Sequence, residues 1–167
     1  MKITKQYLIN LIKEALNEAE FTSKGHWGSQ GSGLLLTTGE RILLLLRSKH
    51  VTEGGTWGIP GGAVEDDEDP FDSALRETEE EMRLSIDSYE LLGQTVFQDD
   101  EDGFKYTTYI LKVPEELTQT QIILDWENDD YDWVDQDWLE DNAHKLHSGV
   151  MYTLEQKWAT IFDSDYL

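Results

Sequence analysis

The sequence predicts an α/β fold in which a mixed β-sheet is covered by helices. Apolar runs typical of strands lie on both sides of a helical segment at residues 70–82, and another helical pattern follows the last of them. The chain has 167 residues, enough for one domain with a substantial core. We expect a main domain over residues 25–167 and a helical extension over residues 1–24.

The first segment, residues 4–20, has apolar residues at helical spacing, which predicts an amphipathic helix. The repeating positions are Leu8, Leu11, Ile12, Ala15, Leu16 and Ala19. We expect this helix to pack on its own domain, and pairing with another subunit's helix in a homodimer is the alternative. Residues 21–32 are rich in Gly and Ser and predict a linker, whose Trp27 either packs on the surface as a lid or stacks on a base.

Two strands are expected at residues 33–36 and 42–46, joined by a turn at residues 37–40. The unbroken apolar run at 42–46 is typical of a strand covered on both faces. Later strands are expected at residues 89–97, 104–113, 122–124 and 131–134. Asp135 is placed to cap a short helix. The last helix carries an apolar stripe made of Met151, Leu154, Trp158, Ile161 and Phe162.

The helix at residues 70–82 has clear start signals. Asp69 is a favourable N-cap and Pro70 a favourable first helical residue, and no Gly or further Pro interrupts the segment. At about 100° per residue, one side of the helix gathers the residues expected to face the core. These are Phe71, Ala74, Leu75, Thr78 and Met82.

Glutamates crowd an adjacent side of this helix. Glu77, Glu80 and Glu81 stand at positions i, i+3 and i+4, whereas Glu79 points away. Two carboxylates about 6 Å apart repel by roughly 3 kcal/mol at an effective dielectric constant of 20. Clustered oxygen ligands suit a hard divalent ion, Mg²⁺ or Mn²⁺. From the helical spacing alone, a solvated acidic face is the alternative.

The spacing of the whole stretch favours the metal site. It resembles the signature of the MutT-like Nudix hydrolase superfamily: a glycine, five residues, a glutamate, seven residues, then R-E-U-x-E-E-x-G-U, where U is a bulky aliphatic residue. The matching positions are Gly62, Glu68, Arg76, Glu77, Glu80, Glu81 and Leu84. Two positions depart from the pattern. Thr78 replaces an aliphatic residue, and Arg83 replaces a glycine whose left-handed conformation costs other residues roughly 1–2 kcal/mol.

The resemblance implies the Nudix α/β/α sandwich over roughly residues 30–140. It also implies metal-dependent cleavage of a diphosphate linkage in a nucleoside diphosphate derivative, with Mg²⁺ or Mn²⁺ as cofactor. By position, the metal ligands would be Glu77, Glu80, Glu81 and the carbonyl of Gly61. The residues that orient them would be Arg76, Glu68 and Gly62.

The base that deprotonates the attacking water is not fixed by the signature. Glu77 is the candidate on the helix. Glu127 resembles the acid that precedes a Trp-aliphatic strand in many members of the superfamily, so we expect it to be a metal ligand or the base. A solvated loop acid is the alternative for Glu127.

The residues that contact the substrate are predicted less specifically than the metal ligands. Arg47 follows a buried strand near the expected mouth of the site, where it contacts a phosphate or pairs with surface acids. Trp57 and Trp27 are the aromatic candidates for substrate binding. Aromatic side chains able to stack a base are Trp27, Phe104, Tyr106 and Trp126.

The charge composition limits the classes of molecule that the protein can bind. With 35 acidic and 13 basic residues, the formal net charge is −22, which disfavours long nucleic acids and anionic membranes but allows a small nucleotide whose phosphates meet a metal. The chain has no cysteine, which fits a reducing compartment, and we expect a cytoplasmic protein without a signal peptide or membrane span.

The leading hypothesis is therefore a small-nucleotide pyrophosphohydrolase. Removal of a 5′ diphosphate from RNA is an alternative that the net charge disfavours. A nucleotide-sensing module without catalysis is the other alternative, and the complete glutamate set disfavours it.

Overall fold

The computed structural model describes residues 30–101 and 103–162. The predicted helix at residues 4–20 and Trp27 lie outside the described residues, so the helical extension and the lid stay predictions. The described elements begin with the strand β1 (Gln30–Thr37) and end with the helix α4 (Ser148–Ile161).

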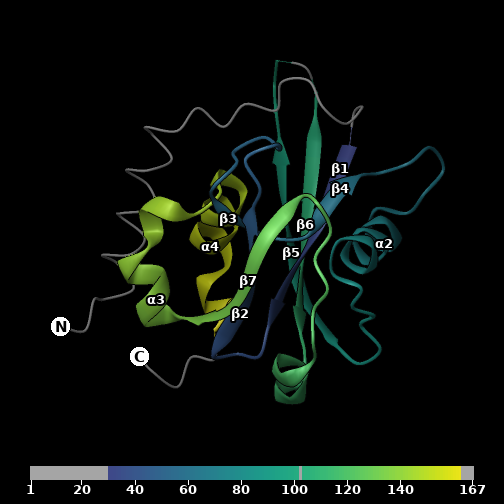
Figure 1. The fold of residues 1–167 in the computed structure, drawn as a ribbon. Helices are drawn as coiled ribbons and strands as arrows, with labels where there is room; N and C mark the ends of the chain where they lie inside the picture. Colours follow the sequence, from purple (N-terminus) through teal and green to yellow (C-terminus); the bar gives the residue numbers. More distant parts are fainter. Residues whose placement is uncertain (1–29, 102, 163–167) are drawn as a thin grey trace.

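A seven-stranded mixed sheet forms the centre of the molecule (Figure 1). Its main path runs β3-β2-β1-β6-β5, with β4 paired to β1 and β7 paired to β2. The pair β1–β6 is parallel, and the other strand pairs are antiparallel. After β1, the strands are β2 (Arg41–Arg47), β3 (Trp57–Gly58), β4 (Gly61–Ala63), β5 (Glu90–Gln98), β6 (Lys105–Lys112) and β7 (Asn128–Asp135).

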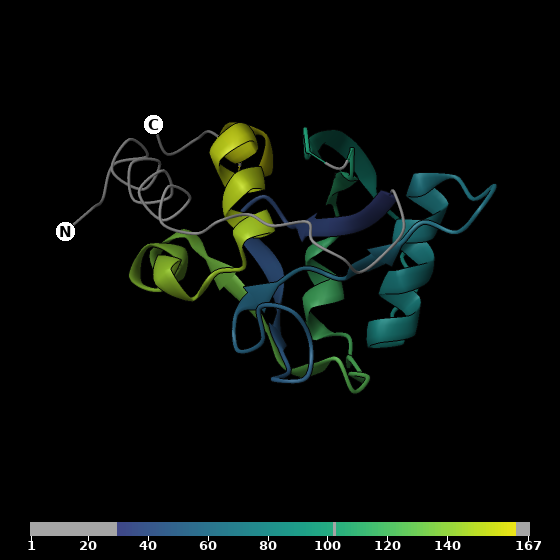
Figure 2. The same cartoon turned by 90° about the horizontal axis from the view of Figure 1, so that it is seen from above.

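Helices cover both faces of the sheet, which confirms the predicted α/β/α sandwich. Figure 2 shows α2 (Pro70–Met82) on one side of the strands and α3 (Gln136–Asp141) with α4 on the other. As predicted, Asp135 caps α3 by accepting the N–H of Trp138 at 2.9 Å. Two short 3₁₀ helices, η1 (Glu115–Gln119) and η2 (Ala143–Lys145), complete the described elements. Within the described residues, no helix is both long and apolar enough to cross a bilayer.

The strands β1 and β2 separate two hydrophobic cores. Leu35 and Leu44 pack with α3 and α4, whereas Leu34 and Leu43 pack with α2. All four side chains are fully buried. This alternation confirms that the apolar run in β2 is covered on both faces, because successive side chains of a strand point to opposite faces.

The sheet opens between β1 and β2. These strands pair only at Thr37 and Ile42 and then diverge. On the side of β1, the short strand β4 pairs antiparallel with Gly31 to Gly33, and on the side of β2 the strand β3 pairs with Leu45 and Leu46. The divergence therefore places the Gly-rich segment at residues 57–63, which contains β3 and β4, in the middle of the sheet beside α2.

Some expected elements differ in the structure. Residues 122–124 do not form a strand, so that prediction is wrong. Instead, Ile123 N–H donates to the carbonyl of Met82 at 3.0 Å and Asp125 N–H donates to that of Glu81 at 2.9 Å, so the segment satisfies the end of α2. The sequence predicts neither β3 nor β4, because runs of two and three residues are too short to show periodicity.

The helix α2 begins and ends at the predicted residues. The Asp69 carboxylate accepts the N–H groups of Phe71 and Asp72 at 2.9 and 3.4 Å. At the other end Arg83 takes the left-handed conformation, φ 52° and ψ 35°, and its N–H donates to the carbonyl of Glu79 at 2.8 Å. Arg83 thus keeps the helix exit that glycine usually provides, at a cost in backbone strain.

Replacing Arg83 by Gly should stabilise the protein. Relief of the left-handed strain is worth roughly 1–2 kcal/mol, and the greater freedom of Gly in the unfolded chain removes about 0.4–1 kcal/mol of it. We expect a net gain of about 1 kcal/mol, seen as a rise in Tm of roughly 2–4 °C in thermal unfolding. Arg83→Ala is the control, since it removes the charge but keeps the Cβ, and an equal gain for both variants would contradict a backbone origin.

Candidate active site

Two glutamates on α2, Glu77 and Glu81, point toward the Gly-rich segment rather than into solvent. Glu81 is only 5% exposed, and its Oε1 accepts the N–H of Gly61 at 2.9 Å. Its Oε2 accepts the side-chain amide of Asn128 at 2.8 Å. Glu77 is also largely covered, whereas the side chain of Glu80 is 55% exposed. The helix therefore presents a graded row of carboxylates, from buried to open.

The glycine at position 62 is required by the Glu77 carboxylate. A Cβ built on Gly62 would lie 2.5 Å from both the Cδ and Oε1 atoms of Glu77. No side chain fits between β4 and the helix at this point. The first glycine of the signature thus has a steric role: it lets the carboxylate rest against the backbone.

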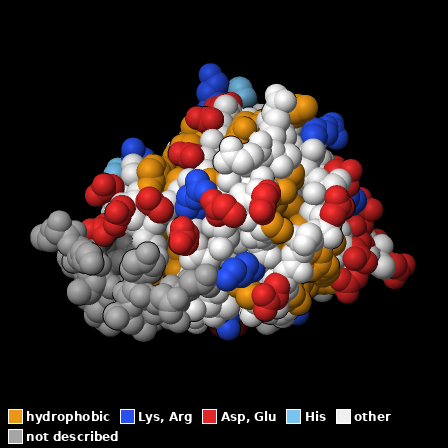
Figure 3. Space-filling model, turned by 90° about the horizontal axis from the view of Figure 1, so that it is seen from below, with side chains coloured by type: hydrophobic (Ala, Val, Ile, Leu, Met, Phe, Trp, Pro, Cys, Tyr) orange, Lys and Arg blue, Asp and Glu red, His pale blue; other side chains and the backbone are white. Residues whose placement is uncertain are grey.

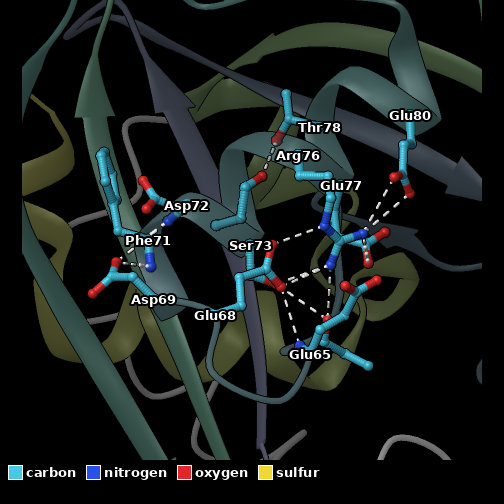
Figure 4. Close-up of polar contacts among 12 residues, drawn as sticks. Glu65, Glu68, Asp69, Phe71, Asp72, Ser73, Arg76, Glu77, Thr78 and Glu80 are labelled. Atoms are coloured by element: carbon cyan, nitrogen blue, oxygen red, sulfur yellow. Dashed lines mark hydrogen bonds and ion pairs between the residues drawn. The ribbon is translucent and has the colours of Figure 1, made fainter.

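One guanidinium group links the loop before α2 to the glutamates on it. Figure 4 shows Arg76 between Glu68 on one side and Glu77 with Glu80 on the other. Its Nε and Nη2 donate to the two carboxylate oxygens of Glu68 at 2.9 and 3.1 Å. Its Nη1 contacts Glu77 Oε1 at 3.0 Å and both oxygens of Glu80 at 3.3 Å, and its Nη2 also donates to the carbonyl of Ala63 at 3.2 Å. Arg76 thus pairs with Glu68 and with both helix glutamates. The orienting role of Arg76 and Glu68 stays a prediction.

The carboxylates differ sharply in their pKa values. The hydrogen bonds from Arg76 lower the pKa of Glu68 to about 2. Burial raises the pKa of Glu81 to about 8, and burial also raises the pKa of Glu77. Anionic Glu77 and Glu81 are thus costly in this site unless additional positive charge enters it.

A second segment brings Glu127 to the same place. Glu127 is half-buried, its N–H donates to Asp125 Oδ1 at 3.0 Å, and its carbonyl accepts the N–H of Ser48 at 2.8 Å. Burial raises the pKa of Glu127, and the charge of Asp125 adds to that shift. The charge of Glu127 in turn raises the pKa values of Glu77 and Glu81. The predicted loop acid therefore lies in the electrostatic range of the helix glutamates.

The loop between β2 and β3 is fastened to the start of α4. The Glu53 carboxylate accepts the hydroxyl of Ser148 at 2.8 Å and its N–H at 3.2 Å, and it lies 2.8 Å from Nε2 of His147. Burial acts to raise the pKa of Glu53, but the hydrogen bond and charge of His147 outweigh it and hold the pKa at about 2. This clamp fixes the loop that follows Arg47.

Arg47 and Trp57 lie at the two ends of that loop. The Nε atom of Arg47 donates to the carbonyl of Thr52 at 2.9 Å, and the charge of Arg47 acts on Glu127 and Tyr106. The Trp57 ring packs edge-on against Trp138 with centroids 5.5 Å apart, partly buried in the core beside α4. Arg47 is thus placed near the acids, whereas a substrate contact by Trp57 stays a prediction, as does one by Trp27.

The surface around the site is strongly acidic. Figure 3 shows carboxylates over much of one face, crowded at the edge where α2 lies. The net charge of −22 agrees with this distribution. Such a surface opposes polyanions and supports the predicted preference for small ligands.

The site suits a divalent cation through the chemistry of its donors. They are all oxygens, and two of them belong to carboxylates whose pKa values are raised by burial. In the part of the chain that the structure describes, no group of three or more acidic or histidine side chains is already arranged to hold a metal ion. Arg76 Nη1 lies between Glu77 and Glu80 instead, and the exposed Glu80 has room to turn toward an ion.

A family model agrees with this geometry. The model of the NUDIX domain matches residues 30–154, which includes all the strands and the glutamate helix. The chain belongs to the NUDIX domain family. The sequence resemblance to the Nudix superfamily is thereby confirmed.

Curated relatives of this Nudix chain carry names of phosphohydrolases. A nucleoside triphosphate pyrophosphatase/Nudix hydrolase fusion protein of Bifidobacterium longum is 38% identical over 91 residues, 50% of this chain and 18% of that protein. A Mycobacterium tuberculosis protein named "Putative 8-oxo-dGTP diphosphatase 3" is 34% identical over 102 residues, 55% of this chain and 47% of that protein. The chain thus spans less than half the length of these relatives.

A solved structure shares the fold. The crystal structure of a C. elegans Ap4A hydrolase binary complex superposes with a TM-score of 0.60 at 22% identity. The match covers 77% of this chain and 95% of that one. At this identity the likeness supports the Nudix sandwich and not a substrate.

The sequence does not predict how Asn128 and Tyr106 lie beside the glutamate cluster. Asn128 is buried and donates to Glu81, and Tyr106 extends toward Gly61 from the neighbouring strand β6. The sequence does place Asn128 directly after Glu127, but no spacing rule links it to the helix. The sequence indicates Tyr106 only as an aromatic side chain able to stack a base, because the strand register between β1 and β6 cannot be read from the sequence.

The pKa of Glu81 predicts a pH-dependent stability of the metal-free protein. Because folding raises this pKa from 4.5 to about 8, the folded state binds more protons between those values. The stabilisation by protonated Glu81 is complete below pH 4.5 and is lost as the pH rises to about 8, with a slope of up to about 1.4 kcal/mol per pH unit. Urea unfolding in the presence of EDTA measures this loss.

Glu81→Gln should remove this dependence. An amide accepts the N–H of Gly61, and the Asn128 amide can turn to pair with it, so the variant should exceed the wild type in stability above pH 8 in EDTA. Glu79→Gln, on the exposed side of α2, should follow the wild-type curve. Parallel curves for wild type and Glu81→Gln would contradict the raised pKa.

Proposed function

We propose that the protein hydrolyses a diphosphate linkage in a small nucleoside diphosphate derivative, using Mg²⁺ or Mn²⁺. The observation that carries this proposal is the convergence of acids from two segments beside the Gly61–Gly62 backbone. Glu77 and Glu81 come from α2 and Glu127 from the loop before β7, and the charge of Glu127 raises the pKa values of Glu77 and Glu81. A structural role alone offers no reason to keep three mutually repelling carboxylates in a partly buried place.

The proposed metal ligands are Glu77, Glu80, Glu81 and the carbonyl of Gly61, with Glu127 as a further candidate. A divalent ion bound there would neutralise phosphate oxygens and lower the pKa of a bound water. Neighbouring groups position the proposed ligands. Gly61 N–H and Asn128 hold the two oxygens of Glu81, and Arg76 orients Glu77 and Glu80 from the far side.

The base is proposed to be either Glu77 or Glu127. Both have pKa values raised by burial, which moves a carboxylate toward the neutral range in which it accepts a proton efficiently. Glu77 forms an ion pair with Arg76, whereas the charge of Arg47 acts to lower the pKa of Glu127. Only activity measurements on variants separate the two.

A small nucleotide is proposed as substrate for two reasons. The acidic surface repels long polyanions, and Arg47 provides positive charge near the acids, where it could contact a phosphate. The relatives' names, which include 8-oxo-dGTP diphosphatase and nucleoside triphosphate pyrophosphatase, support the same class.

A substrate panel scored for released phosphate or pyrophosphate tests the proposal. The panel holds nucleoside triphosphates including 8-oxo-dGTP, ADP-ribose, dinucleoside polyphosphates and 5′-phosphorylated RNA, each with Mg²⁺, Mn²⁺ or EDTA. We expect metal-dependent turnover of a small nucleotide. Glu77→Gln should lower kcat/KM by about 100-fold or more, and the exposed neighbour variant Glu79→Gln should stay near wild type.

Other results of the panel would favour the alternatives. Preference for RNA would support the 5′ pyrophosphohydrolase, against the charge argument. Nucleotide binding by calorimetry with no turnover of any substrate would support a sensing module.

The variant Glu127→Gln tests whether the loop before β7 contributes to catalysis. If Glu127 binds a metal or acts as base, the variant should lose kcat by about 100-fold or more while keeping its Tm within about 1 °C. Asp129→Asn is the matched control, because Asp129 is an exposed acid two positions along the same segment. Activity near wild type for Glu127→Gln would remove it from the mechanism and leave Glu77 as the base.

A further inference from the structure

Tyr106 is the aromatic residue whose surroundings point to a specific role. It lies on β6 in parallel register with Gly31 of β1. Its side chain is on the same face as Leu35 and Ile110, the face that packs with α4 rather than with α2. Tyr106 thus approaches the glycine segment from the side of the sheet opposite the glutamate helix.

Three glycines make room for this side chain. A Cβ built on Gly31 would lie 2.7 Å from Tyr106 Cδ2, and one built on Gly33 would lie 2.6 Å from the hydroxyl oxygen. A Cβ on Gly61 would overlap the same hydroxyl. The ring therefore lies against the backbone of β1, and its hydroxyl reaches β4 at Gly61. Any larger residue at these positions would push the hydroxyl away from the site.

The Tyr106 hydroxyl faces charges of both signs. Burial is the main cause that raises the pKa of this hydroxyl; the negative charges of Glu81 and Glu77 add to the shift, and the positive charge of Arg47 acts against it. Gly61, which it touches, also donates its N–H to Glu81. Within the described residues no group forms a hydrogen bond with this hydroxyl, and the Tyr106 ring packs against Phe104 with centroids 6.5 Å apart. Tyr106 is half-buried as a residue, and its hydroxyl, which has no partner, can bond a ligand that enters beside Gly61.

We propose that Tyr106 is a catalytic residue whose hydroxyl donates a hydrogen bond to a non-bridging oxygen of the substrate diphosphate. The inference rests on the proposed function, since the diphosphate would lie between the acidic cluster and Arg47. A phenol supplies a neutral donor at this position. It can therefore bind a phosphate oxygen without neutralising the carboxylates, as another arginine or lysine beside them would.

The alternative ligand for this hydroxyl is a nucleobase edge, and the two predict different substrate patterns. A contact with the diphosphate is shared by every nucleotide, so its loss should lower activity by a similar factor for all bases. A contact with a base should be lost for some bases and not for others.

Tyr106→Phe tests the proposal, with Tyr109→Phe as the matched control. Both changes remove one hydroxyl from the same strand and keep the ring. Tyr109 lies on the opposite face, where it packs against Phe71 with centroids 5.0 Å apart. A hydrogen bond to a charged group is worth roughly 10- to 100-fold. We expect Tyr106→Phe to lower kcat/KM by about that factor for purine and pyrimidine nucleotides alike, with Mn²⁺ affinity and Tm unchanged and with Tyr109→Phe near wild type.

Several outcomes would overturn the proposal. They are kcat/KM unchanged in Tyr106→Phe, a loss restricted to one base, or an equal loss in Tyr109→Phe. If the wild type turns over no substrate, the proposed function fails separately. In that case, calorimetry with imidodiphosphate and Mg²⁺ tests the hydrogen bond from the Tyr106 hydroxyl to the diphosphate. Weaker binding by Tyr106→Phe than by the wild type supports this hydrogen bond, and equal affinities overturn it.

Discussion

The structure depends on keeping several carboxylates together in a place that is only partly open to water. Arg76 makes this arrangement tolerable, since one planar guanidinium pairs with Glu68, Glu77 and Glu80 at once. The same group donates to the carbonyl of Ala63, so it ties the loop before α2 to the helix itself. Charge balance and loop geometry are therefore fixed by one side chain, and a lysine, with a compact ammonium, could not reproduce this set of contacts.

Glycine decides how closely these groups approach the backbone. On one side of β4 the Glu77 carboxylate rests where a side chain of residue 62 would otherwise stand, and on the other side Tyr106 rests against residue 61. The two contacts converge on adjacent residues because the sheet opens between β1 and β2. The gap between β1 and β2 is thus part of the site, and packing of the two hydrophobic cores fixes the positions of these strands.

The site also carries energetic costs that the fold absorbs elsewhere. Burial raises the pKa values of Glu77, Glu81 and Glu127, and Arg83 is held in a left-handed conformation at the end of the same helix. Such local conflicts are common where chemistry rather than stability selects the residues. The segment at residues 122–128 offsets part of the cost, because it satisfies the end of α2 and supplies Asn128 to Glu81.

The strands with long apolar runs, the limits of α2 and the glutamate row can be predicted from the sequence, because they depend on local periodicity, capping and fixed spacing. The three-dimensional packing shows that residues 122–124 bind the end of α2 instead of forming a strand, and that Tyr106 and Asn128 lie beside Gly61 and Glu81. Those features depend on which distant segments become neighbours and in which register. Local sequence patterns do not specify that register. A shift of one residue along a strand would turn Tyr106 to the opposite face.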